Sequence, residues 1–218
     1  MFLGEDNPSV SHDPRAVRPE RVFDVEAGFE RSSGPLRLAA NLYSMQFRNE
    51  IAATGELSEI GLPLRRNVDS SYRRGLELDA AWQVNSAVRL RSIGSWSRNR
   101  IRRWLDHRNV EPLLTPAVLF SQSVDYAPAA RIAASMTGRY ASRSWLENTN
   151  DRRFYTPSFV NIDANAAYAL TRALRLSLQI NNLLNNERIY PNGYVIDGLP
   201  YYFPQATRNF TLMLDFDL

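Results

Sequence analysis

The chain has 218 residues, of which 44% are hydrophobic and 22% are charged, and its formal net charge is +3. No apolar stretch approaches the roughly 18 residues of a membrane-spanning helix, which excludes a helical membrane protein. All 26 basic residues are arginine, and a net charge this small does not by itself indicate a nucleic-acid-binding protein.

Nine segments alternate between apolar and polar side chains with a period of two. This pattern is typical of β-strands whose two faces meet different surroundings. In chain order the segments are residues 21–31, 36–50, 72–82, 88–96, 118–126, 132–140, 160–168, 174–180 and 210–218. In most of them the even positions carry the apolar side chains, and the last segment keeps this pattern up to Leu218. The sequence therefore predicts an antiparallel all-β fold.

The connections between these segments alternate between short and long. Short turns are predicted at residues 32–35, 85–86, 127–129 and 171–172, and long polar loops near residues 51–69, 99–115, 143–157 and 184–205. Up-and-down transmembrane β-barrels have tight turns at one end and long loops at the other, which is the same alternation. A β-sandwich rarely sorts its connections by end in this way.

Aromatic residues give a second indication of a membrane barrel. They stand on the apolar face near both ends of the predicted strands, where we expect them to lie at the two membrane interfaces. The alternative is the general preference of aromatic residues for strands. The set near the short turns or the chain end is Trp82, Tyr126, Tyr168 and Phe216, and the set near the long loops is Tyr72, Trp96, Tyr140 and Phe210.

The sequence shows no pattern of catalytic, cofactor-binding or metal-binding residues. The two histidines, His12 and His107, fall in predicted loops and are not spaced as metal ligands. Neither a Gly-rich phosphate loop nor a nucleophile elbow occurs. We therefore predict that the protein is not an enzyme and uses no cofactor and no metal.

A basic stretch in a predicted long loop is the candidate ligand-binding site. Its guanidinium groups could attract an anionic ligand or bind phosphate groups. The alternative is a solvated hairpin tip. Together with a second, weaker patch in the preceding loop, the candidate residues are Arg65, Arg66, Arg98, Arg100, Arg102, Arg103 and Trp104.

Several stretches, taken in their order and spacing, resemble the C-terminal barrel portion of a TonB-dependent outer-membrane receptor. They are residues 18–21 with 26–29, 67–78 (NVDSSYRRGLEL), 181–190 (NNLLNNERIY) and 204–208. The resemblance implies that residues 21–218 form about nine strands of a 22-stranded up-and-down barrel. It also implies that residues 1–20 are the remnant of an extracellular loop and that the plug domain is absent from this chain.

The resemblance further implies a location and a function. Such receptors lie in the bacterial outer membrane and import a scarce nutrient, most often a ferric siderophore. Since residues 1–20 contain no apolar core of a signal peptide, we expect the chain to belong to a longer precursor. Expected partners are outer-membrane lipid and lipopolysaccharide, a metal chelate as ligand, and the plug domain and TonB complex in the full-length parent, with no nucleic acid. The alternatives are a porin-like passive channel and a soluble β-sandwich binding module.

Overall fold

The computed structural model describes residues 17–57 and 61–216, which form strands joined by turns and loops. No helix among them is long and apolar enough to cross a membrane. The strands are β1 (Arg21–Ser33), β2 (Leu36–Leu57), β3 (Pro63–Gln83), β4 (Val88–Trp104), β5 (His107–Val110), β6 (Val118–Ala129), β7 (Ile132–Ala141), β8 (Ser144–Trp145), β9 (Tyr155–Thr156), β10 (Phe159–Ala169), β11 (Leu174–Asn181), β12 (Asn192–Ile196), β13 (Leu199–Phe203) and β14 (Asn209–Phe216).

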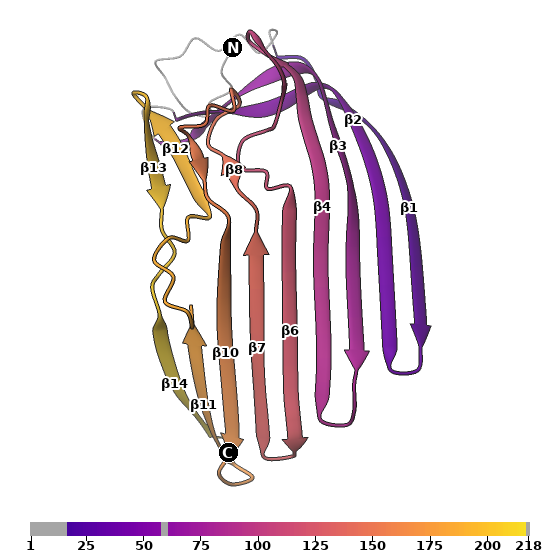
Figure 1. Ribbon diagram of the computed structural model, residues 1–218, viewed down its shortest axis with the longest axis vertical. Helices are drawn as coiled ribbons and strands as arrows, with labels where there is room; N and C mark the ends of the chain where they lie inside the picture. The colour runs from indigo at the N-terminus through magenta and orange to yellow at the C-terminus, as the bar shows by residue number, and fades with distance from the viewer. Residues whose placement is uncertain (1–16, 58–60, 217–218) are drawn as a thin grey trace.

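Nine of these strands form one large antiparallel sheet in the order β1-β2-β3-β4-β6-β7-β10-β11-β14, and β5 pairs with the end of β4. These nine are the strands that the alternating pattern predicts, each beside its predicted neighbour. Within the described residues β1 and β14 are the edges of the sheet and do not pair with each other (Figure 1). The sheet is therefore an open segment of a barrel wall.

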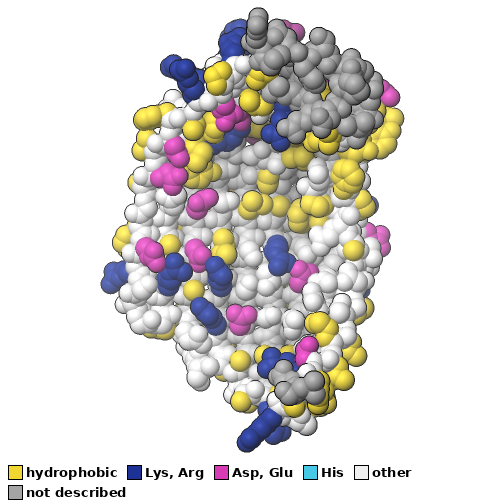
Figure 2. Space-filling model, turned by 180° about the vertical axis from the view of Figure 1, so that it is seen from behind, with side chains coloured by type: hydrophobic (Ala, Val, Ile, Leu, Met, Phe, Trp, Pro, Cys, Tyr) yellow, Lys and Arg dark blue, Asp and Glu magenta, His cyan; other side chains and the backbone are white. Residues whose placement is uncertain are grey.

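The two faces of the sheet differ as the alternation predicts. In the apolar face, register partners place Leu42 beside Leu76 and Leu76 beside Trp96. Large apolar side chains of this face are exposed, with 66% of Trp96 and 69% of Leu212 accessible. The opposite, polar face carries most of the serine, asparagine and charged side chains. Figure 2, seen from behind Figure 1, shows a face on which charged and polar groups predominate.

The two ends of the sheet also differ (Figure 1). At the turn end, tight connections join β1 to β2, β3 to β4, β6 to β7 and β10 to β11. Gly34, with a φ of 54°, supplies the left-handed conformation that the first of these turns requires. At the loop end lie β5 and two small hairpins, β8–β9 and β12–β13, which form separate two-stranded sheets.

The structure corrects the predicted boundaries at the loop end. Residues 51–69 and 99–115 were expected to be long loops, but β2 continues to Leu57, β3 begins at Pro63 and β4 continues to Trp104. His107 likewise lies in β5 and not in a loop. These extensions are polar in sequence yet stay in strand conformation, because they pair with one another and bury a small hydrophobic core.

Two further boundaries differ. The turn predicted at residues 127–129 is displaced, since β6 runs on to Ala129 after a shift of register between Tyr126 and Ala129. Such an irregularity accommodates Pro128, which cannot donate a ladder hydrogen bond. Of the predicted loop remnant 1–20, residues 1–16 lie outside the described residues. The remaining part is held to β3 by two hydrogen bonds between the backbone of Arg18 and the amide of Asn67.

Candidate functional site

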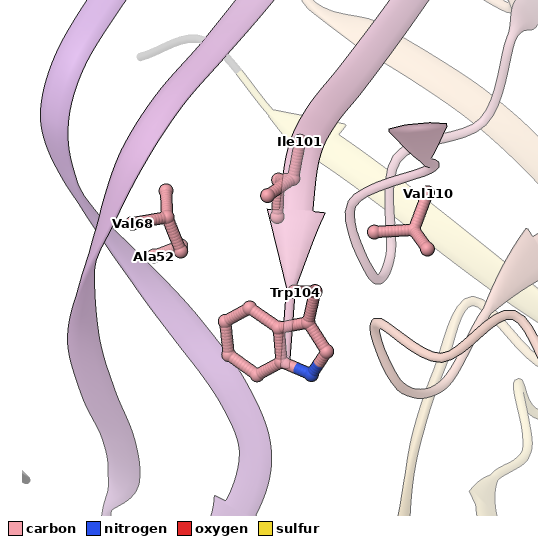
Figure 3. Close-up of a cluster of buried hydrophobic side chains, with 5 residues drawn as sticks. All are labelled: Ala52, Val68, Ile101, Trp104 and Val110. Atoms are coloured by element: carbon pink, nitrogen blue, oxygen red, sulfur yellow. The ribbon is translucent and has the colours of Figure 1, made fainter. Parts of the chain in front are cut away.

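A compact group of hydrophobic side chains, here called the loop-end core, lies at the loop end of β2, β3 and β4. Its members are Ala52, Val68, Ile101, Trp104 and Val110. Ile101 is completely buried and Trp104 is 5% exposed. Figure 3 shows the Trp104 and Ile101 side chains on β4 between Val68 and Ala52 on one side and Val110 on the other. Trp104, predicted as a ligand contact, is thus placed inside the core.

The predicted basic site is divided by the structure into separate groups. Arg66 stacks its guanidinium over the Trp104 ring at 5.4 Å. Arg100 forms an ion pair of 3.0 Å with Glu111, and Arg102 lies 5.9 Å over the ring of Tyr72. Arg98, Arg65 and Arg103 are exposed. These arginines are therefore brought to the loop end of neighbouring strands, but not into a single pocket.

The aromatic residues predicted at the membrane interfaces all stand on the apolar face. Trp82, Tyr126, Tyr168 and Phe216 lie at the turn end, where they are 46%, 46%, 45% and 63% exposed. Trp96 and Phe210 are equally prominent nearer the loop end, whereas Tyr72 and Tyr140 are half-buried. The arrangement suits two interfacial rows, and the contact of these residues with lipid stays a prediction.

A group of aromatic side chains on the hairpin β12–β13, here called the aromatic hairpin, was not expected from the sequence. The rings of Tyr194 and Tyr201 stack with centroids 5.3 Å apart, and the ring of Phe203 lies 5.5 Å from that of Tyr194. Tyr201 and Phe203 are 45% and 53% exposed. The hairpin therefore offers aromatic faces at the loop end of the sheet.

The hairpin owes its shape to a local signal. Asp197 and Gly198 connect β12 to β13 with φ angles of 52° and 71°. Two residues with positive φ, and an Asp-Gly sequence, are the signature of a type I′ turn between antiparallel strands. Together with the alternation in residues 199–203, this dipeptide could have revealed the hairpin inside the predicted loop 184–205.

Tyrosine contacts join the aromatic hairpin to strand β9. The Tyr202 hydroxyl donates a hydrogen bond of 3.2 Å to the backbone oxygen of Tyr155. Tyr190 packs on the other side, with its ring centroid 4.8 Å from that of Tyr202. Burial raises the pKa of the Tyr202 phenol above its usual value of 10.0, so the hydroxyl stays a donor at neutral pH.

Buried asparagines tie the segment between β8 and β9 to the rest of the loop end. The Asn148 side chain, 1% exposed, donates to the backbone oxygen of Ala53 at 2.7 Å and accepts from the backbone nitrogen of Leu113 at 2.8 Å. Asn150 makes a similar pair of bonds with the backbone of Glu111. One loop thus links β2 with the segment that follows β5.

Charged groups surround this segment. The Trp145 ring nitrogen donates to the Glu111 carboxylate at 2.7 Å, and the Arg143 guanidinium lies 4.6 Å over the same ring. Hydrogen bonds from Arg153 lower the pKa of the Asp151 carboxyl to about 2, so this pair is fully ionised at neutral pH. Aromatic faces next to guanidinium groups can bind planar or anionic ligands.

The polar face carries a different chemistry. Its arginines are largely paired across strands, as Arg91 with Asp79 at 3.2 Å and Arg37 with Glu30 at 2.9 Å show. Between these pairs lies a hollow of ≈ 380 Å³ whose lining includes Arg37, Asp79 and Arg91. Within the described part of the chain, no group of three or more histidine, cysteine, aspartate or glutamate residues is placed to hold a metal ion.

Comparison with solved structures shows the same fold in larger proteins. The ferric yersiniabactin uptake receptor FyuA of Yersinia pestis superposes with a TM-score of 0.76 at 14% identity, over 91% of this chain and 30% of its own. The ferric-catecholate import receptor Fiu of E. coli K12 gives 0.72 at 18% identity, over 98% and 30%. The siderophore receptor PiuA of Acinetobacter baumannii gives 0.68 at 16%, over 90% and 28%.

This chain therefore spans about three tenths of the length of each of these proteins. A search of curated proteins found no significant match. The family described as TonB dependent receptor-like, beta-barrel matches residues 4–183, which is most of the chain. With nine strands side by side in one open antiparallel sheet and an exposed apolar face, the chain belongs to this family of outer-membrane receptor barrels and is a segment of such a barrel.

Proposed function

We propose that the chain supplies wall strands and ligand-capturing loops to a receptor that imports an anionic metal chelate, with a ferric siderophore as the first candidate. The observation that carries this proposal is the aromatic hairpin beside the arginine-rich loop end. Support comes from the family and from the names of three proteins of the same fold, which are receptors for ferric yersiniabactin, ferric catecholates and a siderophore.

The aromatic and the basic residues would contribute to ligand capture in different ways. Tyr201 and Phe203 expose ring faces on which an aromatic or conjugated chelating group could stack. The guanidinium groups of Arg65, Arg103 and Arg188 are exposed at the same end of the sheet and would attract a negatively charged ligand. The loop end would then face the outside of the cell and the turn end the periplasm.

Transport would require parts that lie beyond this barrel segment. In the full-length parent, a plug domain would rest against the polar face, and the TonB complex would drive its rearrangement after the ligand is captured. The cross-strand ion pairs of the polar face suit this role, because paired charges keep the wall hydrated without a large net field. This chain by itself would not transport the ligand.

The test is uptake of radioactive iron by cells that produce the full-length protein containing this chain. Binding and uptake of a ferric catecholate would be compared between the wild type and a Tyr201→Ala, Phe203→Ala double variant. Loss of two stacking contacts should weaken binding about tenfold, since each aromatic contact contributes about 0.5–1.5 kcal/mol beyond burial. Tyr168→Ala, at the turn end, is the matched control and should bind normally.

Energy coupling separates this proposal from its alternative. Uptake should stop in cells that lack TonB, while surface binding persists. Uptake that continues without TonB would instead support a porin-like passive channel. If neither binding nor uptake of any ferric chelate depended on the protein, the proposed ligand class would be wrong. A soluble sandwich module is not supported, since the described strands of the wall form one sheet and not two packed layers.

A further inference from the structure

Two arginines interrupt the apolar face of the sheet near its loop end. Arg74 on β3 and Arg98 on β4 are direct register partners, so their side chains leave the sheet next to each other on the same face. Both residues are exposed. Two adjacent positive charges repel each other, and a position that faces a membrane makes the arrangement more costly unless an anion lies between them.

The described residues do not supply that anion. No described carboxylate lies within ion-pair distance of Arg74 or Arg98. The guanidinium of Arg74 instead lies 5.0 Å from the centre of the Tyr72 ring. The guanidinium of Arg102, which follows further toward the loop end of β4, lies 5.9 Å from the centre of the same ring. Arg100, the register partner of Tyr72, is the member of this group that has a carboxylate partner, Glu111.

An apolar groove of ≈ 520 Å³ begins directly below these two arginines. One row toward the turn end, Leu42, Leu76 and Trp96 are neighbours across β2, β3 and β4. A row is two residues, or about 6.7 Å along a strand. The other lining residues of the same face on β1 and β2 are Val25, Ala27 and Ser44. The groove is thus mainly apolar along its length and positively charged at the end nearer the loop end.

We propose that this groove binds a phosphorylated lipid of the outer leaflet, with a phosphate between Arg74 and Arg98 and an acyl chain along Leu42, Leu76 and Trp96. Guanidinium groups bind phosphate oxygens bidentately, and a phosphate dianion would neutralise both neighbouring charges at once. The apolar lining selects an amphiphile over free phosphate, because a soluble anion would leave the groove below it uncovered.

The loop end faces outward under the proposed orientation, and the phosphorylated amphiphile there is the lipid A part of lipopolysaccharide. This inference uses the family's location in the outer membrane and the orientation of the sheet. It does not depend on which ligand is transported. The lipid site lies on the apolar face, whereas the aromatic hairpin and the polar face serve the proposed capture and transport.

The test uses the full-length protein containing this chain, purified in mild detergent. Native mass spectrometry would measure the fraction that carries added lipid A with both of its phosphates. An Arg74→Ala, Arg98→Ala double variant should bind about tenfold more weakly, because it loses charge-assisted hydrogen bonds from both arginines. The matched control is Arg89→Ala with Arg175→Ala, which removes two arginines from the polar face and should bind lipid A as the wild type does.

Two further probes identify the source of the phosphate. Lipid A from which both phosphates have been removed should bind the wild type as weakly as the double variant does. Inorganic phosphate at millimolar concentration should fail to displace phosphorylated lipid A. Displacement by inorganic phosphate, equal binding of the dephosphorylated lipid, or an equal loss in the polar-face control would each overturn the proposal.

Folding of the variants is checked independently. Folded barrels migrate differently from heat-denatured ones in gels, and the double variant should keep the wild-type shift. An Arg74→Lys, Arg98→Lys variant retains the charges but lacks the bidentate fork, so it should recover only part of the affinity. If the alanine variant fails to fold, the affinity of the folded lysine variant for lipid A still tests the proposal. A lysine variant that binds lipid A as tightly as the wild type would contradict bidentate recognition. These variants should take up iron normally, so a loss of lipid A binding tests the lipid site alone and a loss of uptake in the aromatic variant tests the proposed function alone.

Discussion

The wall and the loop end of this molecule are stabilised in opposite ways. In the wall, inner strands such as β6 and β7 contain no buried residue, and the apolar side chains of both lie mainly on one face. At the loop end, the hydrophobic residues that are buried form the loop-end core or pack under the β8–β9 segment and the β12–β13 hairpin. Ile101, Leu146 and Ile189 are completely buried, each with 0% exposure.

This difference indicates which solvent each region meets. A wall without a core of its own is held by its ladder of backbone hydrogen bonds, and under the proposed placement in the outer membrane its apolar face would contact lipid. The loop end would remain folded in water, so it builds a small conventional core and pairs most of its buried polar atoms within the chain, with the Asn99 side-chain oxygen as an exception. The boundary between the two regions lies near the row of Arg74 and Arg98, where apolar side chains give way to charged ones.

Truncation of Trp104 is expected to have the largest effect on the loop end. Trp104→Ala removes the largest side chain of the loop-end core and should destabilise that region by about 3–5 kcal/mol. Amide hydrogen exchange of residues 99–110 should accelerate accordingly, while exchange in β10 and β11 stays unchanged. Trp96→Ala is the matched control on the apolar face. If the Trp104 variant opened the wall as well, the two regions would form one cooperative unit and the contrast would be wrong.

A charge on the apolar face should have a somewhat smaller effect, located in the wall. Leu178 pairs with Leu212, which is one residue from the midpoint between Phe210 and Phe216, and so lies near the middle of the apolar band. Leu178→Arg should cost about 2–4 kcal/mol in a lipid bilayer, because the guanidinium would sit near the bilayer midplane. Urea unfolding of the full-length protein in vesicles would measure this loss.

The control for this substitution lies on the other face of the sheet, in the neighbouring strand. Asn165→Arg, on the polar face of β10, adds the same charge and should change stability little. Equal losses for both variants would mean that the apolar face does not contact lipid. If neither variant lost stability, the apolar face would again not contact lipid, since an arginine in water costs little on either face.

The wall was predictable from the sequence because each of its strands is marked by an alternation among residues that are adjacent in the chain. Each residue of a wall strand lies on either the apolar or the polar face of the sheet, so polarity alternates along most of the strand and the strands can be counted directly. The same argument placed Trp82 and Phe216 on the apolar face near the turn end. The nine strands and their neighbour relations follow from this alternation and from the short turns that join them.

The loop end was predicted less well because its contacts join residues far apart in the chain. Polar composition suggested loops at residues 51–69 and 99–115, yet Ala52, Val68 and Ile101 meet in a core that no local pattern reveals. All six predicted ligand-binding arginines consequently lie on strands, two on β3 at positions 65 and 66 and four on β4 at positions 98, 100, 102 and 103. The aromatic hairpin was missed for another reason: its signal, Asp197 and Gly198 before an alternating segment, was present but read as part of a loop.

The smallest of the expected effects concerns the polar contacts of the loop end. Asn148→Ala leaves the backbone oxygen of Ala53 and the backbone nitrogen of Leu113 without their partner in a buried site. The expected loss is about 1–3 kcal/mol, since buried polar groups that lose their hydrogen bonds keep their desolvation cost. Limited proteolysis should cleave the segment between β8 and β9 faster, and hydrogen exchange at Leu113 should rise.

The matched control is Asn165→Ala, which removes the same side chain from an exposed position of the wall and should alter neither measurement. If Asn148→Ala were also silent, water would be able to reach these backbone groups, and the loop end would be a loosely packed surface and not a second folded region. If it were as damaging as Trp104→Ala, the core and the asparagine contacts would open together. An intermediate loss confined to the β8–β9 segment is what a hydrophobic core with polar ties at its margin requires, because the ties can break while Ile101 and Trp104 stay buried.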